Sequence, residues 1–159
     1  MTTDETVDDV DRRLLTVLNR DPRATTVALA QAAGVSRNTV QARLNKWERV
    51  GALRPFDRCI EPAFLGYPLR TFILTQVRQR LLSAVSDALV TIPEVVEVQG
   101  LSGGSDLLIQ VVATNADDLY RIAGRILEIK GVRRTRTSLV MRDLIDYRLA
   151  QLIRPDGGR

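Results

Sequence analysis

The spacing of the apolar residues changes along the chain, and this change divides it into two domains. In the first fifty positions apolar residues recur at helical intervals, whereas after residue 69 helical intervals alternate with runs typical of strands. The segment between carries three prolines and a glycine, which disfavour helices and central strands. We therefore predict a helical domain over residues 1–54, a linker over 55–68 with a short strand at 56–60 as the alternative, and a second domain over 69–159.

The first domain is predicted to hold three helices. One apolar stripe marks the first helix: Val10, Leu14, Leu15 and Leu18. Thr25 or Thr26 is suited to cap the second helix, and Gly34 lies just past its end, where a left-handed residue is favoured. Ser36 is suited to cap the third helix, which Gly51 ends. The short turn between the second and third helices is typical of a helix-turn-helix, and we expect the winged form.

The third predicted helix has one apolar stripe and one polar side. Val40, Leu44 and Trp47 share the stripe, and the other side is small, amide-bearing and basic. Alone, this pattern favours a solvated surface helix; the preceding helix and turn favour a helix that enters a DNA groove. The predicted DNA-binding residues are Arg23, Ser36, Arg37, Asn38, Thr39, Gln41, Ala42, Arg43, Asn45, Lys46 and Arg49.

Different side chains in this set suit different parts of DNA. Arg37 is suited to guanine, Asn38 or Gln41 to adenine, and Thr39 to the thymine methyl group. The basic residues further along are expected to meet phosphates, which position the protein without reading sequence. These are Arg43, Lys46, Arg49 and Arg54.

The second domain is predicted to follow a β-α-β-β-α-β order. Strands are expected at 69–77, 95–103, 105–113 and 132–144, the last as one strand or a pair, and helices at 79–92 and 116–131, with a tail at 145–153. This order is typical of an α+β, ferredoxin-like fold, in which two helices cover one face of a four-stranded antiparallel sheet.

The sequence lacks the residues on which most enzymes and metal sites depend. It has no histidine, and Cys59 is its only cysteine. Neither a G-x-S-x-G nor a P-loop pattern occurs. We therefore expect no enzyme, no bound metal and no cofactor.

Charge and hydropathy indicate the kind of partner. The net charge of +4 suits an anionic partner. No run of about 18 apolar residues occurs, and the acidic first residues differ from a signal peptide. We expect a cytoplasmic protein that binds double-stranded DNA and no membrane. The alternative is a small-molecule-sensing assembly protein whose helical domain binds protein.

The segment "LSGGSD" at 101–106 is a candidate ligand site. Gly103 and Gly104 let a ligand approach the backbone, turn amides suit a carboxylate, and Asp106 suits an ammonium group. An amino acid presents both groups. The alternative is a plain hairpin turn whose aspartate accepts hydrogen bonds from backbone amides.

The chain resembles the Lrp/AsnC family of bacterial and archaeal transcription regulators over about residues 8–150. In the first half the matching positions are Asp11, Leu14, Leu15, Leu18, Arg23, Leu29, Ala30, Ser36, Val40, Arg43, Leu44, Gly51 and Leu53. In the second half they are Pro93-Glu94-Val95, "SGGSD" and "GVRRTRTSLVM". The family pattern Thr-Gly-x-aromatic-Asp reads Ser102-Gly103-Gly104-Ser105-Asp106 here, without the aromatic residue.

This resemblance implies a regulator whose second domain assembles and senses a small molecule, commonly an amino acid. It implies edge-to-edge dimers that often build larger rings such as octamers, and an effector site between them. The effector-binding residues expected on this basis are Ser102, Gly103, Gly104, Asp106, Thr135 and Thr137. The roles of Arg133, Arg134 and Arg136 stay open between an acidic effector, a neighbouring subunit and a solvated edge.

The strands of the second domain also indicate self-association. Phe72, Leu74, Ile109 and Val111 are too many apolar residues for one face of a small domain to bury. We therefore expect at least a dimer, whose recognition helices meet half-sites about one turn of DNA, or a multiple, apart.

Overall fold

The computed structural model describes residues 7–153, and its contacts divide the chain into two compact units. One unit comprises residues 56–144, and the other comprises the chain before 56 together with the chain from 145 onward. Residues 1–6 and 154–159, at the ends of the two expected domains, lie outside the described residues. None of the described helices is long and apolar enough to cross a membrane.

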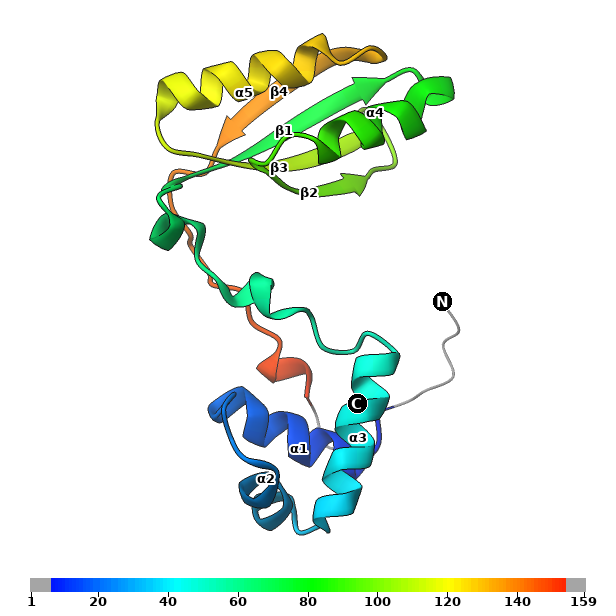
Figure 1. Ribbon diagram of the computed structural model, residues 1–159, viewed down its shortest axis with the longest axis vertical. Helices are drawn as coiled ribbons and strands as arrows, with labels where there is room; N and C mark the ends of the chain where they lie inside the picture. The colour runs from blue at the N-terminus through cyan, green and yellow to red at the C-terminus, as the bar shows by residue number, and fades with distance from the viewer. Residues whose placement is uncertain (1–6, 154–159) are drawn as a thin grey trace. The chain divides into compact units, whose positions relative to one another are not determined.

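The first unit contains the three predicted helices: α1 (Asp9–Arg20), α2 (Thr26–Ala33) and α3 (Arg37–Arg49) (Figure 1). Their buried side chains form one core: Leu14, Leu29, Ala30, Ala33, Val40 and Trp47. The predicted caps are confirmed, because Thr25 accepts from Ala28 N at 3.2 Å and Ser36 accepts from Thr39 N at 3.1 Å. Gly34 has the left-handed φ of 65° that the tight turn requires.

The segment after α3 differs from expectation in two respects. Within residues 50–68 the structure contains no strand, so neither the wing nor the alternative strand at 56–60 is present there. Two 3₁₀ turns occupy this segment instead, η1 (Phe56–Cys59) and η2 (Pro62–Leu65). Arg58 forms a two-armed ion pair with Glu97, both distances being 3.0 Å, and so fixes η1 to the second unit.

The second unit has the predicted β-α-β-β-α-β order. Its elements are β1 (Leu69–Val77), α4 (Leu82–Val90), β2 (Val95–Gly100), β3 (Leu107–Ala113), α5 (Ala116–Glu128) and β4 (Val132–Leu139). A 3₁₀ turn, η3 (Gln79–Leu81), leads into α4. The strands form one antiparallel sheet in the order β2-β3-β1-β4, which confirms the ferredoxin-like plan.

The main core lies between the sheet and the two helices. Ile73 of β1 and Ile109 of β3 are fully buried against Leu89 of α4 and Ile122 of α5. Because all of these side chains belong to one cluster, α4 and α5 cover the same face of the sheet. The other face has no helix of this unit on it, and we call it the open face.

The four apolar strand residues that we judged too many for one face divide between the two faces of the sheet. Phe72 and Leu74 alternate with the buried Ile73 and therefore lie on the open face. Ile109 and Val111 are fully buried in the core on the opposite face. The set divides in this way because Ile73 pairs directly with Ile109, which sets the two strands in phase by residue parity.

The chain from 145 onward was expected in the second domain, but its described residues group with the helix-turn-helix unit. This segment ends in a 3₁₀ turn, η4 (Ala150–Leu152). Arg54 places its guanidinium 5.6 Å from the centre of the Tyr147 ring, within reach of a cation–π interaction. The tail therefore packs against the end of the helical part of the first unit.

Candidate DNA-contacting helix and effector loop

Four side chains form a continuous exposed row along α3. Asn38, Ala42, Asn45 and Arg49 recur at i, i+4, i+7 and i+11, and all four are exposed. This row lies opposite the buried Val40 and Trp47, which anchor the helix to its own core. We call the row, with Gln41 beside it, the α3 outer face. A small residue and two amides on such a row allow close approach to polar base edges.

The first turn of α3 is ordered by hydroxyl groups. Ser36 Oγ accepts from the backbone N–H of Thr39 at 3.1 Å and lies 2.8 Å from Thr39 Oγ1. These hydroxyls are thus engaged with each other, which makes Ser36 and Thr39 positioning residues of the helix start. Arg37 and Asn38, between them, are exposed.

A second contact orders the middle of the α3 outer face. Gln41 Nε2 donates to Asn45 Oδ1 at 2.9 Å, one helical turn further along. Among the described residues, the Gln41 oxygen and the Asn45 nitrogen have no hydrogen-bond partners, so this pair offers one free acceptor and one free donor. An adenine edge in the major groove offers the matching donor and acceptor.

Arg43 does not belong to this face, although we predicted it as a phosphate contact. Its Nη2 lies 2.7 Å from Asp8 Oδ2, and its Nη1 lies 3.2 Å from Asp11 Oδ2. The Asp11 side chain is only 3% exposed, so the arginine compensates a buried carboxylate. The backbone N–H of Asp11, followed by Arg43, lowers the pKa of Asp8 below its ordinary value. Arg43 therefore joins α3 to α1.

The remaining predicted phosphate contacts differ in their surroundings. Arg23 and Arg49 are exposed, whereas Lys46 is half-buried. Arg54 lies over the Tyr147 ring, as described above. Arg49, on the α3 outer face, is the best placed cation of the group.

The loop 101–106 is tied to the end of β1 by Asp106. Its Oδ2 accepts from the backbone N–H of Val77 at 2.8 Å, and its Oδ1 accepts from Gln79 Nε2 at 2.7 Å. Its own backbone N–H donates to Thr75 O at 2.9 Å. Asp106 therefore does what the plain-turn alternative described, and both carboxylate oxygens already have donors.

The glycines of the same loop adopt the geometry expected of a tight turn. Gly103 has a φ of 109°, a region that disfavours other residues, and Gln76 Nε2 donates to Gly104 O at 2.7 Å. Within residues 7–153, the backbone N–H groups of residues 102–105 form no hydrogen bonds. The loop thus presents several unpaired backbone donors.

The two threonines of β4 lie at different distances from this loop. Thr135 pairs with Thr75, whose carbonyl accepts from Asp106, so the structure brings Thr135 next to the loop. Thr137 pairs with Ile73, one step further from it. The hydroxyl of Thr75, the direct partner of Thr135, is buried and has no hydrogen-bond partner within the described residues.

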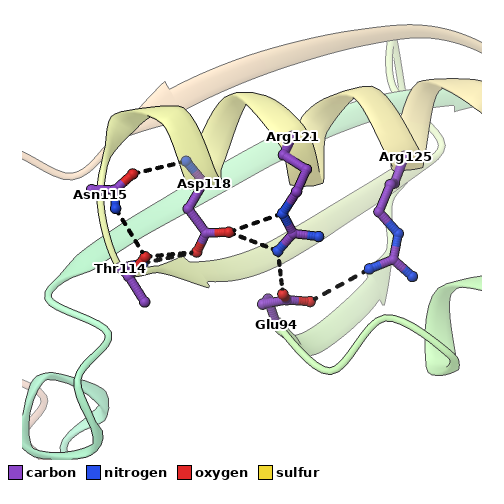
Figure 2. A network of polar contacts seen from close by, with 6 residues as sticks. All are labelled: Glu94, Thr114, Asn115, Asp118, Arg121 and Arg125. Carbon is purple, nitrogen blue, oxygen red and sulfur yellow. Dashed lines mark hydrogen bonds and ion pairs between the residues drawn. The ribbon is translucent and has the colours of Figure 1, made fainter.

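The opposite end of the sheet holds a network of compensated charges (Figure 2). Arg121 Nη2 lies 2.6 Å from Glu94 Oε1 and 2.6 Å from Asp118 Oδ1, while Arg125 lies 3.9 Å from Glu94 Oε2. Burial raises the pKa of Glu94, but hydrogen bonds from Arg121 and from a backbone amide outweigh it and leave the pKa below its ordinary value. The network fixes α5 to the start of β2.

The same network begins at the first turn of α5. Asp118 accepts from the backbone N–H of Thr114 at 3.0 Å, and this bond, followed by Arg121, lowers the pKa of Asp118. Asn115 caps the helix by accepting from Asp118 N at 2.9 Å, as the sequence predicted. In the sequence, Pro93-Glu94-Val95 stood out only as a family match. The signal for an ion pair was the spacing of Asp118 and Arg121, which lie three positions apart on one helix face.

Comparisons with known proteins place both units in one family. The model of the Lrp/AsnC ligand binding domain matches residues 70–150, and that of the AsnC-type helix-turn-helix domain matches residues 7–48. The HTH-type transcriptional regulator AldR of Mycolicibacterium smegmatis is 30% identical over 142 residues, covering 87% of this chain and 83% of AldR. The regulator FL11 of Pyrococcus horikoshii is 29% identical over 136 residues, covering 86% of this chain and 90% of FL11.

Solved structures show the same arrangement of elements. The feast or famine regulatory protein of M. tuberculosis, complexed with L-methionine, is 28% identical, has a TM-score of 0.78, and the alignment covers 91% of this chain and 98% of that one. E. coli AsnC is 24% identical with a TM-score of 0.80, and the alignment covers 92% of this chain and 99% of AsnC. This likeness supports the fold. The chain therefore belongs to the Lrp/AsnC family and is a DNA-binding, helix-turn-helix transcriptional regulator with a ligand-binding domain.

Proposed function

We propose that this regulator reads its operator with the α3 outer face, entering the major groove of duplex DNA. The observation that carries this proposal is the exposed row from Asn38 to Arg49, in which small and amide side chains precede an arginine. The buried Val40 and Trp47 hold the opposite side of the helix in the core and so fix the angle at which the row is presented.

The residues of this face divide into two roles. Arg37, Asn38, Gln41 and Asn45 are assigned to base edges, because they are exposed and carry the donors and acceptors that bases match. Arg49 and Arg23 are assigned to phosphates, which supply affinity without sequence preference. Ser36 and Thr39 order the helix start, and Arg43 holds α3 to α1.

A homodimer is the assembly that the open face favours. Phe72 and Leu74 lie on this face between the polar edges of the sheet, and no helix of the same unit covers them. A second copy that covers this face buries them and brings two recognition helices to one operator. Further association, up to an octamer, is an expectation from the family.

The ligand-binding domain is proposed to respond to a small molecule at the loop 101–106. The M. tuberculosis relative binds L-methionine, as its structure is described, so an amino acid is the first class to test. The unpaired loop amides and the adjoining Thr135 support this position. As a regulator of bacterial or archaeal DNA, the protein is expected to act in the cytoplasm.

The DNA assignment is tested by selecting bound genomic fragments and then titrating a specific and a scrambled duplex at several salt concentrations. Arg49→Ala is expected to weaken both duplexes and to reduce the dependence of affinity on salt. Arg13→Ala, an exposed arginine on α1, is the matched control. Equal losses for the two variants contradict the assignment of α3 as the DNA-contacting helix.

A further inference from the structure

We propose that the ligand of the second unit is a small anion with at least two negative charges, bound at the end of the sheet toward which β1 and β2 point (Figure 1). This inference rests on the proposed ligand-binding function and names the chemical class of the ligand. The bound compound is a dicarboxylate or a phosphate ester, and its recognition does not depend on an ammonium group.

Two basic segments meet at this end of the sheet. Arg78, directly after β1, donates its backbone N–H to Gly131 O at 2.8 Å, just before β4. Arg134 is the direct partner of Gln76, whose side chain contacts the loop at Gly104. The exposed cations carried by these two segments are Arg78, Arg80, Lys130, Arg133 and Arg134, and we call them the sheet-end cations.

The sheet-end cations have no charge partners among the residues that the structure describes. Within residues 7–153, none of their side chains forms an ion pair or a side-chain hydrogen bond, whereas at the opposite end Arg121 pairs with Glu94 and Asp118, and Arg70 pairs with Asp143. The carboxylates nearest to these segments along the chain are Asp87 and Glu128, both exposed. Asp106 is brought to the same end by its hydrogen bond from Val77 N. Five cations beside these three carboxylates leave a net positive potential that favours a multiply charged anion over a zwitterion.

The loop 101–106 adds neutral donors to the same end. Its backbone N–H groups at 102–105 are unpaired, and Gly103 and Gly104 carry no side chains that shield them. Successive backbone donors in a turn form a concavity suited to anions. Gln76 and Asp106 tie the loop to β1, next to the basic segments, so amides and arginines adjoin one another.

Asp106 does not supply the ammonium contact that an amino acid needs. Its oxygens accept from Val77 N at 2.8 Å and from Gln79 Nε2 at 2.7 Å, so both already bind donors of the chain. An ammonium group placed there shares a carboxylate that already accepts two hydrogen bonds of the chain, and it meets the repulsion of the neighbouring arginines. The local chemistry thus selects against the positive end of a zwitterion.

The test measures binding to the full-length protein by isothermal titration calorimetry at constant ionic strength. The probes are succinate, 3-phosphoglycerate, L-glutamate and L-methionine, which separate carboxylate from phosphate and two negative charges from a zwitterion. At least one of the first two is expected to bind about tenfold more tightly than L-methionine. If L-methionine binds more tightly than both anions, the inference is overturned, but the protein is still a regulator that binds a ligand. If no probe binds, the inference is also overturned, and the DNA titration described above tests the proposed function separately.

Charge variants locate the site. Arg78→Gln and Arg134→Gln are each expected to weaken anion binding about three- to tenfold, the range for losing one charge-assisted contact. Arg142→Gln, with the same charge change at the opposite end of the sheet, is the control and is expected to change nothing. Equal weakening of anion binding by all three variants overturns the inference. So does a loss of DNA affinity in the absence of ligand that is confined to Arg78→Gln and Arg134→Gln, because these cations then serve DNA binding.

The Asp106→Asn variant tests the direction in which anion affinity changes when one negative charge is removed. Asparagine keeps an oxygen that accepts from Val77 N and removes the negative charge. Binding of the anion is expected to be unchanged or several-fold tighter, because a repulsive charge is lost. Weaker binding of the same anion, in a variant that melts at the parent temperature, overturns the inference.

Discussion

Arg43 on α3 and Asp11 on α1 form an ion pair across 32 positions of sequence, with Nη1 3.2 Å from Oδ2. Asp11 also takes part in the capping box of α1, since Asp8 accepts from Asp11 N at 2.8 Å. One arginine thus fixes the start of α1 to the middle of α3, the proposed DNA-contacting helix. This contact explains why Arg43, which sequence alone assigns to a DNA phosphate, instead points toward α1 inside the first unit.

Arg43→Ala is expected to destabilise the helix-turn-helix unit by about 2–3 kcal/mol, because it leaves the buried Asp11 carboxylate uncompensated. The value lies below that for a fully buried pair, since the Arg43 side chain is 26% exposed. Urea denaturation monitored by Trp47 fluorescence measures the change, with Arg13→Ala as control. The slope of DNA affinity against salt should stay at the parent value; a reduced slope restores Arg43 as a phosphate contact.

Gln41→Ala and Asn38→Ala are each expected to cost about 1–3 kcal/mol in binding the specific operator and little in binding a scrambled duplex. Both side chains are exposed on α3, so their loss leaves the core intact. Fluorescence anisotropy with the two duplexes measures the difference. A loss of equal size on both duplexes removes the residue from the base-reading group.

Features set by neighbouring residues were predictable from the sequence. The bounds of β1, Leu69–Val77, were predicted correctly because apolar and β-branched residues fill the run between Pro68 and Arg78. Gly34 and Ser36 were predicted because their roles depend on the adjoining helix ends alone. The order of strands and helices followed from the same local signals.

Features set by distant residues were not predictable in this way. Arg43 has the same sequence neighbours whether it meets DNA or Asp11, and only the packing of α1 decides. Asp106 is likewise bound by Val77 and Gln79, which lie 29 and 27 positions away. The face on which Ile109 lies depends on its pairing with Ile73, a long-range register that no local pattern fixes.

Glu94 is expected to contribute to stability in a defined pH range. Its pKa in the folded protein lies below the ordinary value of 4.5, because its hydrogen bonds outweigh the effect of burial. The folded state therefore favours the ionised form, so this contribution is complete above pH 4.5 and is lost as the pH falls through the lower folded pKa. In Glu94→Gln, the free energy of unfolding, measured by urea denaturation, should therefore fall less steeply as the pH is lowered below 4.5. An unchanged dependence on pH contradicts the assignment.

Leu74→Glu is expected to convert the proposed dimer to a monomer. Leu74 lies on the open face, where Arg136 is its direct neighbour on β4, so the substituted chain has a local cation and should remain folded. In a two-fold assembly both copies bury the new carboxylate at the interface, and the cost of removing these charges from water opposes association. Sedimentation equilibrium at micromolar concentration measures the mass, and Val90→Glu, at a residue 84% exposed on α4, is the control of equal charge. A dimer that survives Leu74→Glu, or a parent protein that sediments as a monomer, shows that the open face is not the interface. Dissociation by both variants contradicts the assignment as well, because Val90 is on a helix that covers the other face.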